Sequence, residues 1–181
     1  MPTNFDDRIN QAWSESQWII DEMFVGGMCL FEGYIPAVDL TGLSTRLLQI
    51  SEDSSSIDFS HSVWANSTTE EDWNREYGLN EYVAFFQSGR ILDLHAEYVA
   101  TCSCYSFAFK LIFEQHANID VICYRENLLP RNETRDRFRA ACQHFKHLHA
   151  LFDGKALFLG PDTSNYPAWP DTEPNEWQRL L

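Results

Sequence analysis

The chain has 181 residues, of which 44% are hydrophobic and 14% aromatic, so it can bury one globular core and general disorder is excluded. Its formal net charge of −14 disfavours binding to nucleic acid or to an anionic membrane. No apolar run reaches the roughly 18 residues of a membrane-spanning helix, and the N-terminus carries two aspartates where a signal peptide would be basic. We therefore expect a cytoplasmic protein.

The negative charge is unevenly distributed along the chain. Residues 1–124 have a net charge of −14, residues 125–155 of +3 and residues 156–181 of −3. Such a field speeds encounter with a basic protein, although a need for solubility alone would also explain it.

The five cysteines are an odd number without a C-x-x-C motif, which predicts reduced, buried thiols rather than a disulfide framework.

The N-terminal third predicts one helix and three strands. Residues 4–24 carry apolar side chains mostly at three- and four-residue steps, which predicts an amphipathic helix with Asn4 as its cap and a bend near residues 14–16. Gly26 and Gly27 would end it. After that the period changes towards two. Residues 28–35 predict a strand, and residues 45–65 a hairpin with its turn at residues 53–56.

The middle of the chain predicts a short helix and a second hairpin. In residues 66–81, Thr68 and Glu71 have capping-box spacing, and Gly78 would end the helix. Residues 82–100 predict a hairpin with a two-residue turn at Ser88 and Gly89. Two further strands follow at residues 104–113 and 119–124, and their short connection favours antiparallel pairing.

The C-terminal part predicts a second long helix, a strand and an arm. Residues 132–152 repeat apolar side chains at helical spacing, with Asn132 as the cap and Gly154 at the end, and residues 155–160 predict a strand. Residues 161–181 contain four prolines, which exclude a long helix or a central strand. We expect Trp169 and Trp177 to anchor this arm to the body.

Together these elements predict an α+β fold. We expect an antiparallel sheet of about five to seven strands with two long amphipathic helices on one face and a Pro-rich C-terminal arm. Residues 1–160 would form a single domain, and residues 161–181 an extended Pro/Trp arm packed on it.

The stretch LHAEYVATCSC invites a zinc-deaminase interpretation, because these enzymes combine His-x-Glu with a pair of cysteines. Here Cys102 and Cys104 form a Cys-x-Cys pair without a preceding proline, and the local alternation of apolar and polar residues predicts a strand. We therefore expect no zinc site. The same alternation places Asp93, His95 and Glu97 side by side on one sheet face, either as an acid–base set or as a solvated cluster.

The late helix contains His144, His147 and His149, of which only the first two share a face by their spacing. Two ligands do not complete a zinc site, so we expect neither a metal nor another cofactor. Its arginines alternate with acids, as on an ordinary helix surface. The sequence also lacks a G-x-S-x-G elbow, a P-loop, a dinucleotide fingerprint and an H-E-x-x-H motif.

In size, acidity, lack of an export signal and lack of a catalytic motif, the chain resembles bacterial immunity proteins that neutralise polymorphic toxins delivered by contact-dependent or type VI systems. This resemblance implies stoichiometric blockade of a toxin, often a basic nuclease or another cytosolic poison. It assigns no role to any residue, because it rests on no shared motif.

Three hypotheses for function follow. The first is an acidic inhibitor that binds a protein partner with a basic surface and is not an enzyme. The second is a small enzyme that uses the Asp93, His95 and Glu97 face, and the third is a DNA mimic or general interaction module with carboxylates spaced like phosphates. For the inhibitor, the predicted contact residues are Glu70, Glu71, Asp72, Glu76, Asp93 and Glu97.

Overall fold

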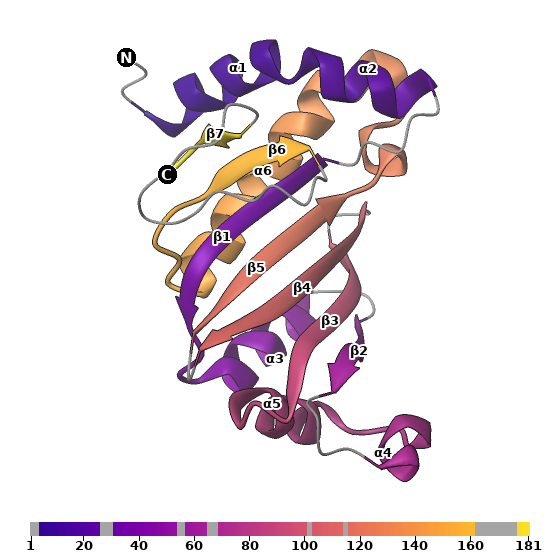
Figure 1. Cartoon of the computed structure of the whole chain (residues 1–181). Helices are drawn as coiled ribbons and strands as arrows, with labels where there is room; N and C mark the ends of the chain where they lie inside the picture. Colours follow the sequence, from indigo (N-terminus) through magenta and orange to yellow (C-terminus); the bar gives the residue numbers. More distant parts are fainter. Residues whose placement is uncertain are drawn as a thin grey trace.

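The structure is a computed structural model that describes residues 4–25, 31–53, 57–64, 69–100, 103–113, 116–161 and 177–181. The described strands form an antiparallel seven-stranded sheet in the order β2-β3-β4-β5-β1-β6-β7 (Figure 1). The predicted α+β fold with an antiparallel sheet is confirmed. The strands are β1 (Phe31–Asp39), β2 (Ile57–Trp64), β3 (Ile91–Ala100), β4 (Ser103–Phe113), β5 (His116–Cys123), β6 (Phe158–Pro161) and β7 (Gln178–Arg179).

The helices pack around one face of this sheet and at its ends. They are α1 (Phe5–Glu15), α2 (Gln17–Val25), α3 (Leu43–Asp53), α4 (Glu70–Asn74), α5 (Leu79–Gln87) and α6 (Thr134–Leu151), with 3-10 turns η1 (Arg125–Leu128) and η2 (Arg131–Glu133). Helices α5 and α6 share a face, because Phe86 and Phe152 both contact Phe109 of β4. None of the described helices is both long and apolar enough to cross a membrane.

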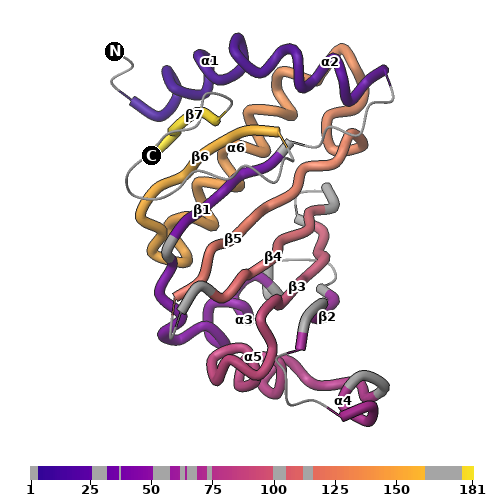
Figure 2. The backbone as a smooth tube through the Cα atoms, viewed as in Figure 1, coloured from indigo at the N-terminus to yellow at the C-terminus, as the bar shows by residue number. Residues whose placement is uncertain are grey.

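The N-terminal helix bends where the sequence predicts. The helical run is interrupted at Ser16, between α1 and α2. The side chain of Asn4 caps α1 by accepting a hydrogen bond from the Asp7 amide at 2.9 Å. Gly26 and Gly27 lie outside the described residues. Helices α1 and α2 lie at one end of the molecule, and α4 lies at the opposite end (Figure 2).

The first predicted hairpin is wrong in its first arm, because residues 43–53 form helix α3. The buried side chains of Leu43, Leu47 and Ile50 are spaced by four and three residues, which is the period of a helix face rather than of a strand. The second arm is correct, since Ile57–Trp64 forms β2. Most of the predicted turn lies outside the described residues.

The second predicted hairpin is wrong in the same way, because residues 79–87 form helix α5. Gly78 begins this helix instead of ending the previous one, and its amide donates to the Glu81 carboxylate at 3.2 Å. Aromatic residues favour strands on propensity, but burial of Tyr82 and Phe86 on one helix face outweighs that preference here. Strand β3 follows as predicted.

Helix α6 begins at Thr134 rather than after an Asn132 cap, because residues 131–133 form the 3-10 turn η2. The hydroxyl of Thr134 donates to the Leu128 carbonyl at 3.0 Å, which ties the start of α6 to η1. The strand predicted at residues 155–160 is β6, which begins at Phe158.

The C-terminal residues 177–181 contact β1 and β6. Trp177 is buried, and its ring centroid lies 5.9 Å from that of Tyr34 in β1. Strand β7 pairs with β6 in antiparallel register. Trp169 and the rest of residues 162–176 lie outside the described residues.

The approach of α6 to the sheet depends on Gly33 in β1. A Cβ atom at this position would lie 2.6 Å from Cδ2 of Phe145, well inside van der Waals contact. Phe145 is fully buried and also meets Tyr105 edge-on, with ring centroids 6.4 Å apart. The missing side chain therefore lets the Phe145 ring lie directly on the backbone of β1.

We expect Gly33→Ala to lower the free energy of unfolding by about 1–3 kcal/mol, because the added methyl forces Phe145 and α6 away from the sheet. Gly78→Ala is the matched control, since the nearest atom to a Cβ there is 4.0 Å away. That control should change stability by less than about 1 kcal/mol. Urea unfolding measures both, and equal stability of the two variants would contradict the packing role of Gly33.

Candidate functional site

Two carboxylates face each other at the β2 edge of the sheet. Strands β2 and β3 pair in antiparallel register with Asp58 opposite Glu97, and both side chains are exposed. Like charges directly opposite on neighbouring strands destabilise a sheet, by roughly 0.2–1 kcal/mol. Folding stability therefore does not explain this pair of acids.

Three more exposed carboxylates follow at this end of the molecule, from Glu70 and Glu71 in α4 and from Glu76 just after it. The fourth predicted acid of this segment, Asp72, has a different role. Its carboxylate accepts hydrogen bonds from the Thr69 amide at 3.0 Å and from the Tyr77 hydroxyl at 3.1 Å. The hydrogen bond from the Thr69 amide, helped by those from Arg90 and Tyr77, lowers the pKa of Asp72 to about 2. The Asp72 carboxylate therefore stabilises α4 and is less available to a partner than the exposed acids.

The cap of α4 differs from the predicted one by a residue in register. The described cap pairs Thr69 with Asp72, whereas the spacing of the sequence predicts Thr68 with Glu71. Thr68 itself lies outside the described residues. Because Asp72 and not Glu71 takes the capping position, Glu71 is left exposed on the helix surface.

We define the acidic surface as Asp58, Glu70, Glu71, Glu76 and Glu97. Burial, together with the charges of Asp58 and Glu76, raises the pKa of Tyr82, so both carboxylates act on the same ring. Within the described part of the chain, four members of this surface make no ion pair; they are Asp58, Glu71, Glu76 and Glu97.

Some acids elsewhere on the molecule are paired with arginines. Asp6 lies 2.8 Å from Arg139, Glu133 lies 3.1 Å from Arg137, and Asp153 lies 2.9 Å from Arg46. Exposed acids without an ion pair also occur at the other end of the described chain, as at Asp21 and Glu22 of α2, so what distinguishes the acidic surface is the direct opposition of Asp58 and Glu97.

The predicted alternation of β3 is confirmed. Leu94, Ala96 and Tyr98 are buried towards the helices, while Asp93 and His95 are half-buried and Glu97 is exposed on the other face. Asp93 stands opposite Lys110 of β4, so its carboxylate is near a cation. Burial lowers the pKa of His95 and the charge of Lys110 adds to this effect, against the charge of Asp93.

An ion pair between a partly exposed lysine and a buried aspartate lies on the same polar face, at the centre of the sheet. Nζ of Lys110 is 2.6 Å from Oδ2 of Asp120, whose side chain is 3% exposed. Burial alone would lower the pKa of Lys110, but the hydrogen bond to Asp120 and the charges of Asp120, Glu32 and Asp93 raise it. Burial and the charge of Asp120 raise the pKa of Tyr34, which stands opposite Asp120 in the register.

Sequence reasoning missed Glu32, Lys110 and Asp120. The available signal was one acid inside each of two apolar strand segments, LFEGYI and NIDVIC. Such isolated acids in buried strands need a cation or hydrogen-bond donors. The partner could not be named in advance, because Lys110 meets Asp120 only through the β4–β5 pairing.

The histidines of α6 do not form a common site. His144 points into the protein, where its ring stacks on Tyr105 and its Nε2 shares a hydrogen bond with the Tyr98 hydroxyl at 2.5 Å. His147 is exposed, so the two histidines predicted to share a face lie in different surroundings. Among the described residues, no three His, Cys, Asp or Glu side chains are grouped so as to hold a metal ion.

Two of the cysteines are buried and free, as predicted for thiols in a reduced core. Burial raises the pKa of Cys123 to about 12 and that of Cys142 well above its usual value, so both thiols stay protonated. The side chains of Cys29, Cys102 and Cys104 lie outside the described part of the chain.

Replacement of Lys110 by Met should lower the free energy of unfolding by about 3 kcal/mol, because it leaves the buried Asp120 carboxylate without this cation. Arg137→Met is the control, since it removes an exposed pair with Glu133 and should cost less than about 1 kcal/mol. Urea unfolding at neutral pH measures the free energy of unfolding of both variants. Equal decreases would show that the Lys110–Asp120 pair stabilises the fold no more than an exposed ion pair does.

The stability of the protein should fall as the pH drops from about 7 towards 4. Burial, with a smaller contribution from His147, lowers the pKa of His144 to about 4 from its usual 6.5. The unfolded chain therefore binds a proton that the folded chain excludes. As a result, the free energy of unfolding falls by roughly 2 kcal/mol between pH 7 and pH 5.

The variant His144→Gln isolates this contribution, because His61, His95 and His149 also have lowered pKa values from burial. Urea unfolding at pH 7 and pH 5 should show a smaller pH-dependent loss in the variant. If the two losses are equal, His144 is not a buried neutral histidine.

Comparison with known proteins gives one structural similarity. No family model and no curated protein matches the chain. The chain is similar to a chain in the 1.75 Å crystal structure of the toxic C-terminal tip of CdiA from Pseudomonas aeruginosa in complex with its immune protein, with 17% identity and a TM-score of 0.46. The alignment covers 76% of this chain and 89% of the other.

Proposed function

We propose that this protein is an acidic inhibitor that binds a partner protein with a basic surface and neutralises it, as an immunity protein neutralises its toxin. The observation that carries the proposal is the acidic surface, whose carboxylates are exposed and mostly outside ion pairs. Asp58 opposite Glu97 costs the fold stability, and a basic partner would turn that repulsion into attraction.

Aromatic side chains beside the acidic surface supply the second component of a protein interface. Tyr77 and Phe85 are half-buried, with ring centroids 5.1 Å apart, and the guanidinium of Arg75 lies 5.4 Å from the centre of the Tyr77 ring. Interfaces are enriched in aromatic and arginine side chains, which contribute most of the binding energy. Charge would speed the encounter, and these side chains would hold the complex.

Under this proposal, Glu97 is part of the binding surface, and Asp93 and His95 carry no catalytic chemistry. Glu97 belongs to the acidic surface, whereas Asp93 stands opposite Lys110. A DNA mimic would use the same carboxylates against a nucleic-acid-binding partner, so competition by duplex DNA for the captured partner separates that case.

The experiment is affinity capture of the full chain from cells of its source organism, with washes across a salt series and identification of captured proteins by mass spectrometry. We expect one stoichiometric partner that is toxic when expressed alone and harmless when this chain is co-expressed. A chain carrying His95→Ala should protect equally well, because protection needs binding and not catalysis. Loss of protection in that variant, or capture of no stoichiometric partner, would overturn the proposal.

Reversing two charges of the acidic surface tests its part in the encounter. The double variant Glu71→Lys, Glu76→Lys should slow association with the captured partner by about tenfold at low salt, with a smaller effect at high salt. The matched control is Asp21→Lys, Glu22→Lys on α2, which reverses the same number of exposed charges at the other end of the molecule. Stopped-flow kinetics that are equal for both variants would remove the acidic surface from the interface.

A further inference from the structure

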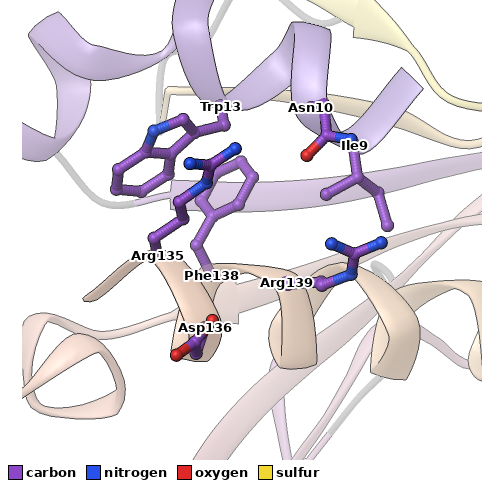
Figure 3. A pocket seen from close by; sticks show the side chains of 7 residues that line it. All are labelled: Ile9, Asn10, Trp13, Arg135, Asp136, Phe138 and Arg139. Carbon is purple, nitrogen blue, oxygen red and sulfur yellow. The ribbon is translucent and has the colours of Figure 1, made fainter. Parts of the chain in front are cut away.

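A groove lies between α1 and α6, at the end of the molecule away from α4. It has a volume of about 200 Å³ (Figure 3). Ile9 and Phe138, both buried, form its floor, and Trp13 forms one wall. Arg135, Asp136 and Arg139 line it from α6, and the side chain of Asp136 points away from Trp13. The groove is thus apolar at its base, and on the side that faces Trp13 the charged groups of α6 are the guanidinium groups of Arg135 and Arg139.

Trp13 is placed as an anchor for an apolar side chain. It is half-buried, and its ring meets that of Phe138 edge-on, with centroids 5.2 Å apart and planes at 72°. This contact holds the indole in one orientation while part of its surface stays open to the groove. Partly exposed tryptophans on a rigid base are typical binding hot spots.

Among the described residues, an unpaired cation lies at this groove. Within the described part of the chain, Arg135 is exposed and has no ion-pair partner. It lies in the first turn of α6, where the helix dipole disfavours a cation. Arg139 pairs with Asp6, but both side chains are about half exposed, so a ligand can replace that pair at little cost.

The size of the groove restricts its occupant. Small-molecule sites usually have volumes of about 300–1,000 Å³, so about 200 Å³ suits a single large side chain better than a whole metabolite or cofactor. The two guanidinium groups beside the groove can bind a carboxylate that neighbours this side chain. The volume and the arginines together therefore fit a short acidic peptide segment.

We propose that this groove docks an acidic segment of a partner protein, with a large apolar side chain against Trp13 and a neighbouring Asp or Glu carboxylate bound by Arg135 and Arg139. The groove would be a second interaction surface, at the other end of the molecule from the acidic surface (Figure 1). The inference does not depend on the proposed inhibitor function.

The probe is a displayed library of random octapeptides, selected on the full chain and counter-selected on the Trp13→Ala variant. We expect enriched peptides that carry Asp or Glu within two positions of Leu, Phe, Tyr or Trp. Enrichment of peptides without an acidic residue, or no enrichment over the counter-selection, would overturn the proposal.

The affinity of the enriched peptide then tests the cationic side of the groove. Arg135→Gln should weaken binding by about tenfold or more in calorimetric titration, because it removes a charged donor to the carboxylate. The matched control is Arg137→Gln, which removes the same charge two residues away, where the side chain pairs with Glu133 and does not line the groove. Because Arg135 is exposed, we expect Arg135→Gln to fold normally, so it tests the groove even if Trp13→Ala disturbs the packing of α1 on α6. Equal affinities of the two variants would overturn the proposal.

Other occupants give different results. Displacement of the peptide by AMP would make the groove a nucleotide site, and a concentration-dependent dimer that Arg135→Gln abolishes in sedimentation would make the occupant a second copy of this chain. Either result overturns the acidic-segment proposal. The Glu71→Lys, Glu76→Lys variant should bind the peptide normally, so failure here is distinguishable from failure of the inhibitor proposal.

Discussion

The contact between Phe145 and Gly33 sets how α6, and through it α1, lies on the helical face of the sheet. Because β1 has no side chain at residue 33, α6 approaches the backbone closely and buries Phe145 completely. The stacking of His144 on Tyr105 follows from the same placement, since His144 is the preceding residue. Helix α1 in turn packs on α6 through Trp13 and Phe138, so the groove between them depends on how α6 sits on the sheet.

Strands were easier to predict than the two helices of the middle region. In β3 the alternation of apolar and polar residues is clean, and the pairing with β4 confirms it. In α3 and α5 the apolar residues come in adjacent pairs, such as Leu47 with Leu48 and Tyr82 with Val83, which fit either a strand or a helix. Tertiary contacts select the helix in α5, where Phe86 packs against Phe109, a residue far away in the sequence.

The candidate sites also contain features that the local sequence predicts and features that depend on tertiary packing. The exposure of Glu70, Glu71 and Glu76 could be predicted, because acids dense on a short segment have no room to be buried together. The opposition of Asp58 and Glu97 could not, since the first arm of the expected hairpin was a helix and β2 pairs with β3 instead. The meeting of Trp13 with Arg135 likewise needs the packing of α1 on α6, which no local pattern encodes.

The position of Asp58 on β2 has a consequence for association between copies of this chain. Strand β2 is the last strand on one side of the described sheet, and an outer strand can pair with a strand of another molecule. The exposed carboxylate of Asp58, with that of Glu97 opposite it, places like charges along this edge. Two copies brought edge to edge would repel each other there, so the same carboxylates that would attract a basic partner also oppose aggregation through the sheet.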